Sequence, residues 1–417
     1  MIIATAEGFC NMKGYEKNME YRCKRGYSGG LVEKYMRIPG RGAMLERGDR
    51  YEGVANASAV RCPHTCSRHM AFGNIVGKSV RRGLAAVFAF AALVLCGCGQ
   101  QQELNERTVY ALGTVCTISI YGEEALADEA EQLLYAIDQE MSWRRAESDI
   151  SKINEGSGGF VEVSEDTFRV IARALEIGKA SGGALDITAG VLTREWNISE
   201  DPHVPDRETI ERGLELIDYS RVELDEETCS VKIGEGQFLD VGAVAKGYAA
   251  DRLTLLFREG GVKSGLINLG GNVCVIGKRP DGRGYRTGIR DPEKGEGENF
   301  AVMTVKSDKT IVVSGAYERQ FTENGVTYHH ILDPKTGYPA ESDVLSSVIV
   351  ADSSMTADAL STAVFVMGAD KGLALAEQTE GAEALVVTKS GTLRHTDGLY
   401  SECSIELVKG CRYVEEG

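Results

Sequence analysis

Positive charge and proline are both scarce in this chain of 417 residues. Lys and Arg number 46 against 62 Asp and Glu, which gives a formal net charge of −16. Because nucleic acid binding requires a basic surface, this balance excludes nucleic acid as an expected partner. Pro accounts for 8 residues and Gly for 49, which favours packed structure with many tight turns over a disordered linker. An acidic protein that binds a phosphate ligand needs a local device, such as a divalent cation or a helix N-terminus.

The apolar run Leu84–Leu95 is too short to span a bilayer. It holds twelve residues without interruption, which is typical of the core of a signal peptide. Lys78, Arg81 and Arg82 form a basic region before it. The "LCGC" at its end matches a lipobox, with Cys98 as the lipid-modified residue. A short buried helix is the alternative, and the basic flank and the Leu-x-Gly-Cys ending argue against it.

This interpretation divides the chain into four parts. Residues 1–77 are an unassigned N-terminal extension, and residues 78–97 are a lipoprotein signal peptide. Because a signal peptide must be N-terminal, we expect translation to start near Met70 or at a nearby alternative codon. Residues 98–106 are a polar tether, and 107–417 form one domain. We expect a bacterial protein that is lipid-anchored to the cell membrane and faces the extracytoplasmic side.

After the tether, the periodicity predicts an α+β fold, a single domain with mixed or antiparallel sheets and packed helices. Helical spacing of apolar residues predicts helices at 123–142, 165–181, 207–217, 246–261, 354–367 and 370–380. Enrichment in β-branched residues predicts strands at 108–122, at 264–277 with a break at Gly270-Gly271, at 301–313 and at 344–350. Short strands are also expected within 221–240 and near the C-terminus.

Five cysteines follow Cys98, and their spacing shows no disulfide framework. Cys116 and Cys274 lie inside apolar runs, where we expect buried free thiols. Cys403 and Cys411 are either free or paired in an oxidising compartment.

The predicted helix at 354–367 carries a possible cation site. Asp358, Ser361 and Thr362 are spaced three and four residues apart, so they share one helix face. Their oxygen ligands suit a hard cation, Mg²⁺ or Ca²⁺. A polar stripe on an amphipathic helix is the alternative.

The stretch "LDVGAVAKGYAADRL" is a possible phosphate site. Asp240 ends a strand, Gly242 permits a turn, and Lys246 opens the predicted helix, where free amide groups can face an anion. The pattern is not a P-loop. A surface lysine on a capped helix explains the same residues.

Three further positions each allow two interpretations. Gly270-Gly271 permits close approach of a ligand to the backbone, or marks a β-bulge. Asp186 interrupts an apolar stretch and either binds a ligand donor or caps a helix. His330, one of only six histidines, is either a base for a hydroxyl nucleophile or a structural histidine.

The order of these motifs along residues 107–408 resembles the ApbE family, the FAD:protein FMN transferases. The resemblance rests on nine blocks in register: "LGTVCTI", "MSWRRAESDISKIN", "GGALDITAG", "LDVGAVAKGYAADRL", "INLGGNV", "YRTGIRDP", "VVSGAYERQF", "YHHILDPKTGYPA" and "TADALSTAVFVMG". It implies that residues 107–417 are a flavin transferase domain. Such a domain uses Mg²⁺ to split its substrate FAD, attaches FMN to a Thr or Ser of an acceptor protein, and releases AMP. The resemblance implies that the acceptor belongs to a membrane or exported redox system.

The resemblance also implies a role for individual residues. His330 and Lys246 act in catalysis, whereas His329 is expected to face solvent. The metal is held by Asp358 and Thr362, with Ser361 and the carbonyl of Ala243 nearby. The FAD pocket is lined by Leu112, Trp143, Ala184, Leu185, Asp186, Asp240, Lys246 and Leu332. Leu112, Trp143 and Leu185 stand where the family more often has Met, Tyr and Phe, and none of these changes removes a charge or a metal ligand.

Two alternative functions remain open for the sequence alone. With water as the acceptor, the same site is an FAD pyrophosphatase that gives FMN and AMP. The chain could also be a non-catalytic flavin-binding lipoprotein, but Asp358, Thr362 and Lys246 argue against storage alone, which needs no metal.

Overall fold

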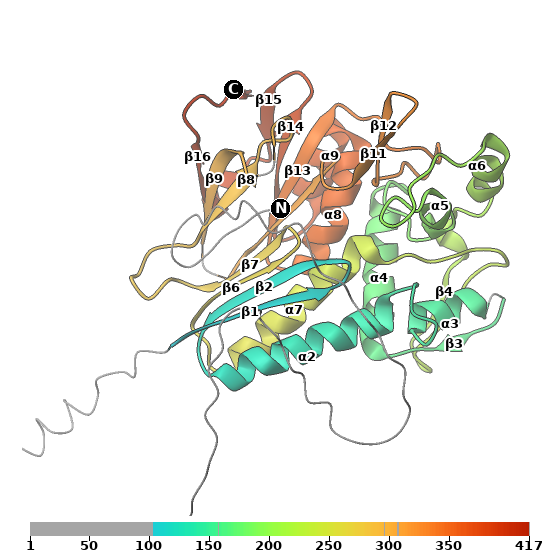
Figure 1. Cartoon of the computed structure of the whole chain (residues 1–417), viewed down its shortest axis with the longest axis horizontal. Helices are drawn as coiled ribbons and strands as arrows, with labels where there is room; N and C mark the ends of the chain where they lie inside the picture. The colour runs from blue at the N-terminus through green and yellow to red at the C-terminus, as the bar shows by residue number, and fades with distance from the viewer. Residues whose placement is uncertain (1–102, 157, 296, 307, 417) are drawn as a thin grey trace, which may run out of the picture. The chain divides into compact units, whose positions relative to one another are not determined.

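The computed structural model describes residues 103–156, 158–295, 297–306 and 308–416 (Figure 1). The predicted extension, the signal peptide and Cys98 lie outside the described residues. Leu104 already belongs to the first strand, so the folded domain includes residues 104–106, which we predicted to be tether.

A nine-stranded sheet forms the centre of the domain. Its strands lie in the order β1 (Leu104–Ala111), β2 (Thr114–Tyr121), β6 (Ser264–Leu269), β7 (Asn272–Gly277), β10 (Thr310–Gly315), β13 (Val344–Ala351), β14 (Ala382–Thr388), β15 (Thr392–His395) and β17 (Val414–Glu415). Every pair in this sheet is antiparallel except β15 with β17, which is parallel. The predicted α+β class with mixed and antiparallel sheets is confirmed.

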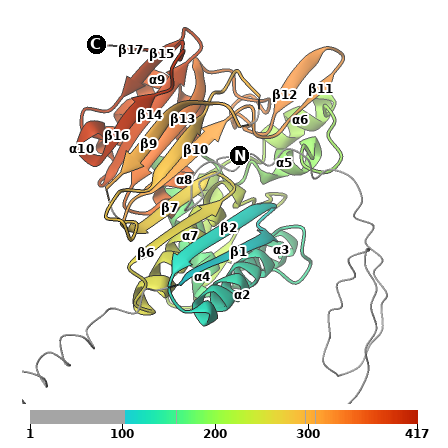
Figure 2. The same ribbon diagram turned by 60° about the vertical axis from the view of Figure 1, so that its left-hand side comes forward.

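Both faces of the central sheet are covered, so its strands are apolar on both sides. On β7, Val273 and Val275 face one hydrophobic cluster, whereas Cys274 and Ile276 face another. The first cluster is closed by a second sheet, in the order β16 (Cys403–Leu407), β9 (Asn299–Val305) and β8 (Arg286–Arg290). The other is closed by the helices α2 (Glu124–Met141), α4 (Glu165–Ala180), α7 (Gly242–Glu259), α8 (Ser354–Met367) and α9 (Ala369–Gln378). Figures 1 and 2 show α2, α7 and α8 along one face of the sheet and β8, β9 and β16 beside the other.

A smaller lobe packs around Trp196, which is fully buried. It contains α5 (Gly190–Trp196), α6 (Arg207–Leu214) and the hairpin of β11 (Gln320–Glu323) and β12 (Val326–His329). The indole Nε1 of Trp196 donates to the carbonyl of Gly337 at 2.9 Å, and this bond ties the loop after β12 to the lobe. The remaining elements are α3 (Asp149–Glu155), η1 (Tyr219–Arg221), α10 (Leu399–Glu402) and a small sheet of β3 (Val161–Glu162), β5 (Ser230–Lys232) and β4 (Glu223–Asp225).

Three of the predicted elements are wrong in extent. The predicted strand 108–122 is the hairpin β1–β2, which turns at Leu112 and Gly113, both with positive φ. The predicted strand 301–313 is divided between β9 and β10. The helix predicted from Lys246 begins at Gly242, because the Asp240 carboxylate accepts the Gly242 N–H at 2.8 Å, so Lys246 lies in the second turn.

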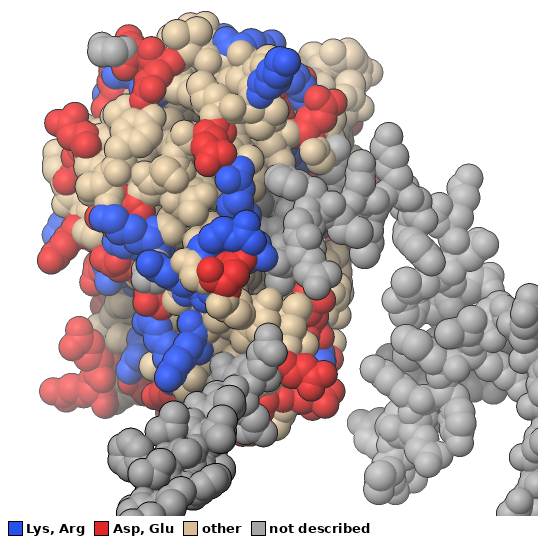
Figure 3. All heavy atoms as spheres, turned by 90° about the vertical axis from the view of Figure 1, so that its left-hand side faces the viewer, with Lys and Arg blue, Asp and Glu red and all other residues tan. Residues whose placement is uncertain are grey.

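Charge is unevenly distributed on the surface. Figure 3 shows Lys and Arg side chains gathered in the middle of one face, with Asp and Glu around them. In the part of the chain that the structure describes, no helix combines the length and apolar character needed to cross a membrane. The five described cysteines are free thiols, and Cys116 and Cys274 are buried as predicted.

Candidate active site

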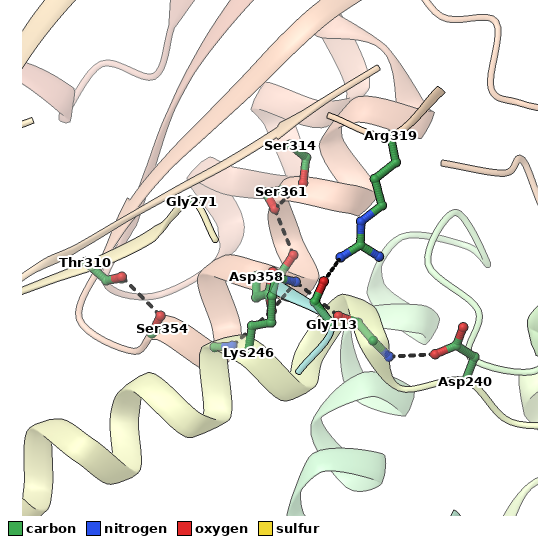
Figure 4. A network of polar contacts seen from close by, with 12 residues as sticks. Gly113, Asp240, Lys246, Gly271, Thr310, Ser314, Arg319, Ser354, Asp358 and Ser361 are labelled. Atoms are coloured by element: carbon green, nitrogen blue, oxygen red, sulfur yellow. Dashed lines mark hydrogen bonds and ion pairs between the residues drawn. The ribbon is translucent and has the colours of Figure 1, made fainter. Parts of the chain in front are cut away.

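The crossing of α7 and α8 brings Lys246 and Asp358 together. Lys246 Nζ lies 3.3 Å from Asp358 Oδ1, and the Gly247 N–H donates to Asp358 Oδ2 at 2.9 Å (Figure 4). The crossing is close because residue 247 is a glycine, where an added Cβ would lie 2.2 Å from the carbonyl oxygen of Ser354. The Asp358 side chain is 4% exposed and that of Lys246 is 21% exposed. The fold therefore holds an ion pair at the edge of the core.

The environment of Asp358 favours the arrival of a cation. Burial raises the pKa of this carboxyl, and Lys246, the Gly247 amide and Asn272 act in the opposite direction. A buried carboxylate that is only partly compensated gains from a further positive charge.

The predicted metal ligands lie on the neighbouring turns of α7 and α8. Lys246 Nζ also donates to the carbonyl of Gly242, the chain neighbour of Ala243, at 3.1 Å. Ser361 is fully buried, and its Oγ bonds the Asp358 carbonyl and Ser314 Oγ, both at 2.8 Å. Thr362 is half-buried on the same helix face. A single carboxylate with hydroxyl and carbonyl oxygens fits Mg²⁺, which keeps several water or phosphate ligands.

Clusters of three or more His, Cys, Asp or Glu side chains suited to a metal are absent from the described ranges. The proposed ligands around Asp358 include only this one carboxylate, and the others are hydroxyl and carbonyl oxygens.

The two adjacent histidines have different environments. His329 Nε2 lies 3.2 Å from the Ala340 carbonyl, its Nδ1 accepts the Ile331 N–H at 3.3 Å, and its ring meets Phe365 edge-on. The expectation that His329 faces solvent is therefore wrong, and it is a hydrogen-bonded structural histidine. His330 has a buried Nδ1 with no hydrogen-bond partner among the described residues.

His330 is neutral at physiological pH. Burial lowers its pKa to about 3, and the charges of Arg319, His329 and Lys246 act in the same direction. An uncharged imidazole with an unpartnered nitrogen can accept a proton or bind a ligand donor. The influence of Lys246 on this pKa also places His330 within electrostatic range of the α7–α8 ion pair.

The residues predicted to line a flavin pocket come from five segments. Leu112 lies in the β1–β2 turn, and its N–H donates to Asp138 Oδ1 at 3.0 Å. Trp143 follows α2, with its ring edge-on to Phe238 at 5.5 Å and the Arg144 guanidinium 3.9 Å from its centre. Leu332 is half-buried and pairs with Pro339 in an isolated bridge.

The other predicted pocket residues have contacts within the chain. Ala184 and Leu185 are buried. Asp186 accepts the N–H and Oγ1 of Thr188 at 2.8 and 2.6 Å and the Tyr219 N–H at 3.0 Å, while burial raises the pKa of its carboxyl. Both Asp186 oxygens thus have donors within the chain, and Asp186 does not cap α5, whose N-cap is Ala189. Asp240 Oδ1 accepts the Gly242 N–H at the start of α7.

Gly270-Gly271 is a hairpin turn and not a β-bulge. The two glycines are the two-residue turn of the β6–β7 hairpin, with Leu269 paired to Asn272. A Cβ at Gly270 would lie 2.3 Å from Thr114 Oγ1, so this turn packs on the start of β2.

Sequence reasoning missed two polar residues of the site. Asn272 is 1% exposed and influences the pKa of Asp358, although its Nδ2 makes no hydrogen bond of normal geometry with a described residue. Arg319 influences the pKa of His330 and donates to the Gly113 carbonyl at 3.0 Å. Their positions in "INLGGNV" and "VVSGAYERQF" were the available signal.

Comparison with known proteins bears on this arrangement. The family model described as "ApbE family" matches residues 112–386, which include every predicted site residue except Cys98. The chain belongs to the ApbE family. An ApbE relative from Treponema pallidum, named FAD:protein FMN transferase, is 34% identical, with 73% of this chain and 92% of that protein covered. A Klebsiella pneumoniae protein of the same name is 35% identical over 69% of this chain and 92% of its own length.

Solved ApbE structures share the fold. The ApbE protein from Thermotoga maritima matches with a TM-score of 0.67 and 33% identity, covering 72% of this chain and 99% of that one. The flavin transferase ApbE from Vibrio cholerae matches with a TM-score of 0.65 and 25% identity, covering 72% and 99%.

Proposed function

We propose that this protein transfers FMN from FAD to a Thr or Ser hydroxyl of an acceptor protein and releases AMP. The observation that carries the proposal is the Lys246–Asp358 pair at the α7–α8 crossing, within electrostatic range of the neutral His330. Membership of the ApbE family and the names of its relatives support the same reaction. The reaction needs positive charge near a pyrophosphate and a base near a hydroxyl, and the site offers both.

The reaction forms one bond to phosphorus and breaks another. The acceptor hydroxyl oxygen bonds to the phosphorus of the FMN half, and the bond from that phosphorus to the bridging oxygen breaks. AMP leaves with the bridging oxygen, and the hydroxyl proton passes to His330. His330 has a low pKa in the free protein, and a nearby anionic pyrophosphate raises it, which makes the imidazole a better base when FAD is bound.

The metal of this proposal is Mg²⁺. Asp358 and Thr362 would hold it, with Ser361 and the Ala243 carbonyl nearby. When bound, Mg²⁺ neutralises negative charge on the phosphates. Lys246 adds a second charge to the same region, and because it bonds Asp358 it also favours the ionised form of that carboxylate.

The isoalloxazine ring needs an apolar wall with one or more aromatic side chains. Trp143 and the half-buried Leu112 and Leu332 can supply it. Ala184 and Leu185 would pack behind this wall, with Asp186 and Asp240 fixing the loops that carry it.

The test separates transfer from hydrolysis. The protein is incubated with FAD, Mg²⁺ and a candidate acceptor, and AMP release is compared with flavin fluorescence that stays on the denatured acceptor. We expect equal amounts of both, and neither in the presence of EDTA. AMP and free FMN without labelled acceptor would identify an FAD pyrophosphatase instead. FAD binding without any turnover would identify a non-catalytic flavin-binding protein.

The cellular setting belongs to the proposal as well. We infer that Cys98 is the lipid-modified N-terminus of the mature protein, which is held on the extracytoplasmic side of a bacterial cell membrane. The acceptor would then be a membrane or exported redox subunit. Intact-mass analysis of protein extracted from its native membrane tests this, and peptides from residues 1–69 in the mature protein would contradict it.

A further inference from the structure

Arg319 lies on the segment between β10 and β11 and, like Lys246, influences the pKa of His330. Its Nη2 donates to the Gly113 carbonyl at 3.0 Å, and its Nη1 lies 3.4 Å from Ser199 Oγ. Figure 4 shows the guanidinium pointing toward Gly113, on the side of the site where Lys246 and Asp358 meet. The Arg319 carbonyl accepts the His330 N–H at 3.1 Å, so the backbone of Arg319 is also tied to the proposed base.

No carboxylate in the described part of the chain forms an ion pair with Arg319. Lys246 has its charge opposed by Asp358 at 3.3 Å, whereas Arg319 makes no salt bridge with any carboxylate of the described ranges. Its chain neighbour Glu318 is near enough for electrostatic attraction, but the two side chains form no ion pair. In a chain of net charge −16, an arginine without a carboxylate partner at the site is an arrangement that favours an anionic ligand.

The hydrogen-bonding capacity of Arg319 is also incompletely used. A guanidinium has five N–H donors, and among the described residues the bonds to Gly113 and Ser199 use two of them. The side chain is exposed, so a ligand can reach the remaining donors. The bond to the turn carbonyl fixes the direction of the fork, and a fixed guanidinium is well suited to two phosphate oxygens.

We propose that Arg319 binds the pyrophosphate of FAD as a further cation, in addition to Lys246 and Mg²⁺. The inference rests on the proposed function, because it assigns a further phosphate-binding residue to the same site. Lys246 and the Mg²⁺ of the proposed function share the Asp358 carboxylate, so part of their positive charge is already opposed, whereas the charge of Arg319 is free to act on the phosphates.

The test compares a ligand that has the pyrophosphate with one that lacks it. Equilibrium binding of FAD and of riboflavin, with Mg²⁺ present, is measured by flavin fluorescence for the full chain and for Arg319→Met and Arg319→Lys. Arg286→Met serves as the matched control, since Arg286 lies on β8 and pairs with Glu406 at 3.0 Å. Thermal unfolding midpoints are recorded for all four proteins.

We expect Arg319→Met to weaken FAD binding about 10- to 100-fold, the range for a charge-assisted hydrogen bond, and to leave riboflavin binding unchanged. Arg319→Lys should recover part of the loss, and Arg286→Met should show none. An equal loss for both ligands would show that Arg319 only braces the Gly113 turn and would overturn the inference. Unchanged FAD binding in Arg319→Met would also overturn it while the proposed function stands, whereas a wild-type protein that does not bind FAD would overturn both.

Discussion

Replacement of Gly247 by Ala tests whether the close approach of α7 and α8 assembles the site. An added Cβ would lie 2.2 Å from the Ser354 carbonyl oxygen and 2.7 Å from Met355 Cα. Both contacts are with backbone atoms, so no side-chain rotation relieves them. The two helices must move apart by about 1 Å to restore ordinary van der Waals contact.

The effect on stability and on activity can be estimated separately. Overpacking costs about 1–3 kcal/mol, and the better helix propensity of Ala returns about 1 kcal/mol, so we expect a net loss of up to about 2 kcal/mol in the free energy of unfolding. The same displacement stretches the 2.9 Å bond from the Gly247 N–H to Asp358 beyond hydrogen-bonding distance. A misplacement of this size in an active site costs about 100-fold in rate.

The assay measures the flavin transfer rate together with the stability of Gly247→Ala toward denaturant. Gly295→Ala is the control, because a Cβ there meets nothing within 4 Å and the glycine has no positive φ. A variant that is as stable and as active as the wild type would refute the view that the α7–α8 contact positions Asp358. A loss of stability with an unchanged rate would separate packing from catalysis and refute the second half of the reasoning.

Other substitutions probe single contacts. Asp358→Ala should abolish flavin transfer and leave weakened FAD binding, and full activity across a Mg²⁺ titration would contradict its role as a ligand. His330→Ala should lower the transfer rate about 10²- to 10⁴-fold, the range for a general base, with little change in the thermal midpoint. A rate loss that merely follows a lowered midpoint would show that His330 has a structural role instead. His329→Ala should instead lower the unfolding free energy, by about 1–3 kcal/mol, since it leaves the buried Ala340 carbonyl without its partner. Trp196→Phe, which removes the bond to Gly337, should cost a similar amount in a denaturation experiment, and an unchanged midpoint would argue against this tie.

Several helices and turns of the fold can be predicted from the local sequence alone. The predicted helix 354–367 coincides with α8, which ends before Gly368. The predicted helix 123–142 exceeds α2 by one residue at each end, because its apolar residues have clear helical spacing. The break at Gly270-Gly271 is confirmed as a hairpin turn. The asparagine–glycine pair 324–325 is an equally clear turn signal, with both residues at positive φ, and it marks the β11–β12 hairpin that we did not predict.

Other features depend on contacts that a linear pattern does not contain. The β1–β2 turn is hidden because Leu112 adopts a positive φ that leucine rarely takes. The true start of α7 depends on the Asp240 carboxylate, and the surroundings of His329 depend on Ala340, eleven residues away. The Lys246–Asp358 pair joins residues 112 positions apart, so the sequence supplied both side chains as candidates but not their contact.

The central claim is that this site moves FMN covalently onto another protein. The most direct measurement is the intact mass of a candidate acceptor after incubation with the full chain, FAD and Mg²⁺, with peptide mapping of the modified residue. We predict a mass increase equal to one FMN less one water, located on a Thr or Ser, and its loss when that residue is replaced by Ala. An acceptor of unchanged mass in a reaction that has consumed FAD would contradict the claim.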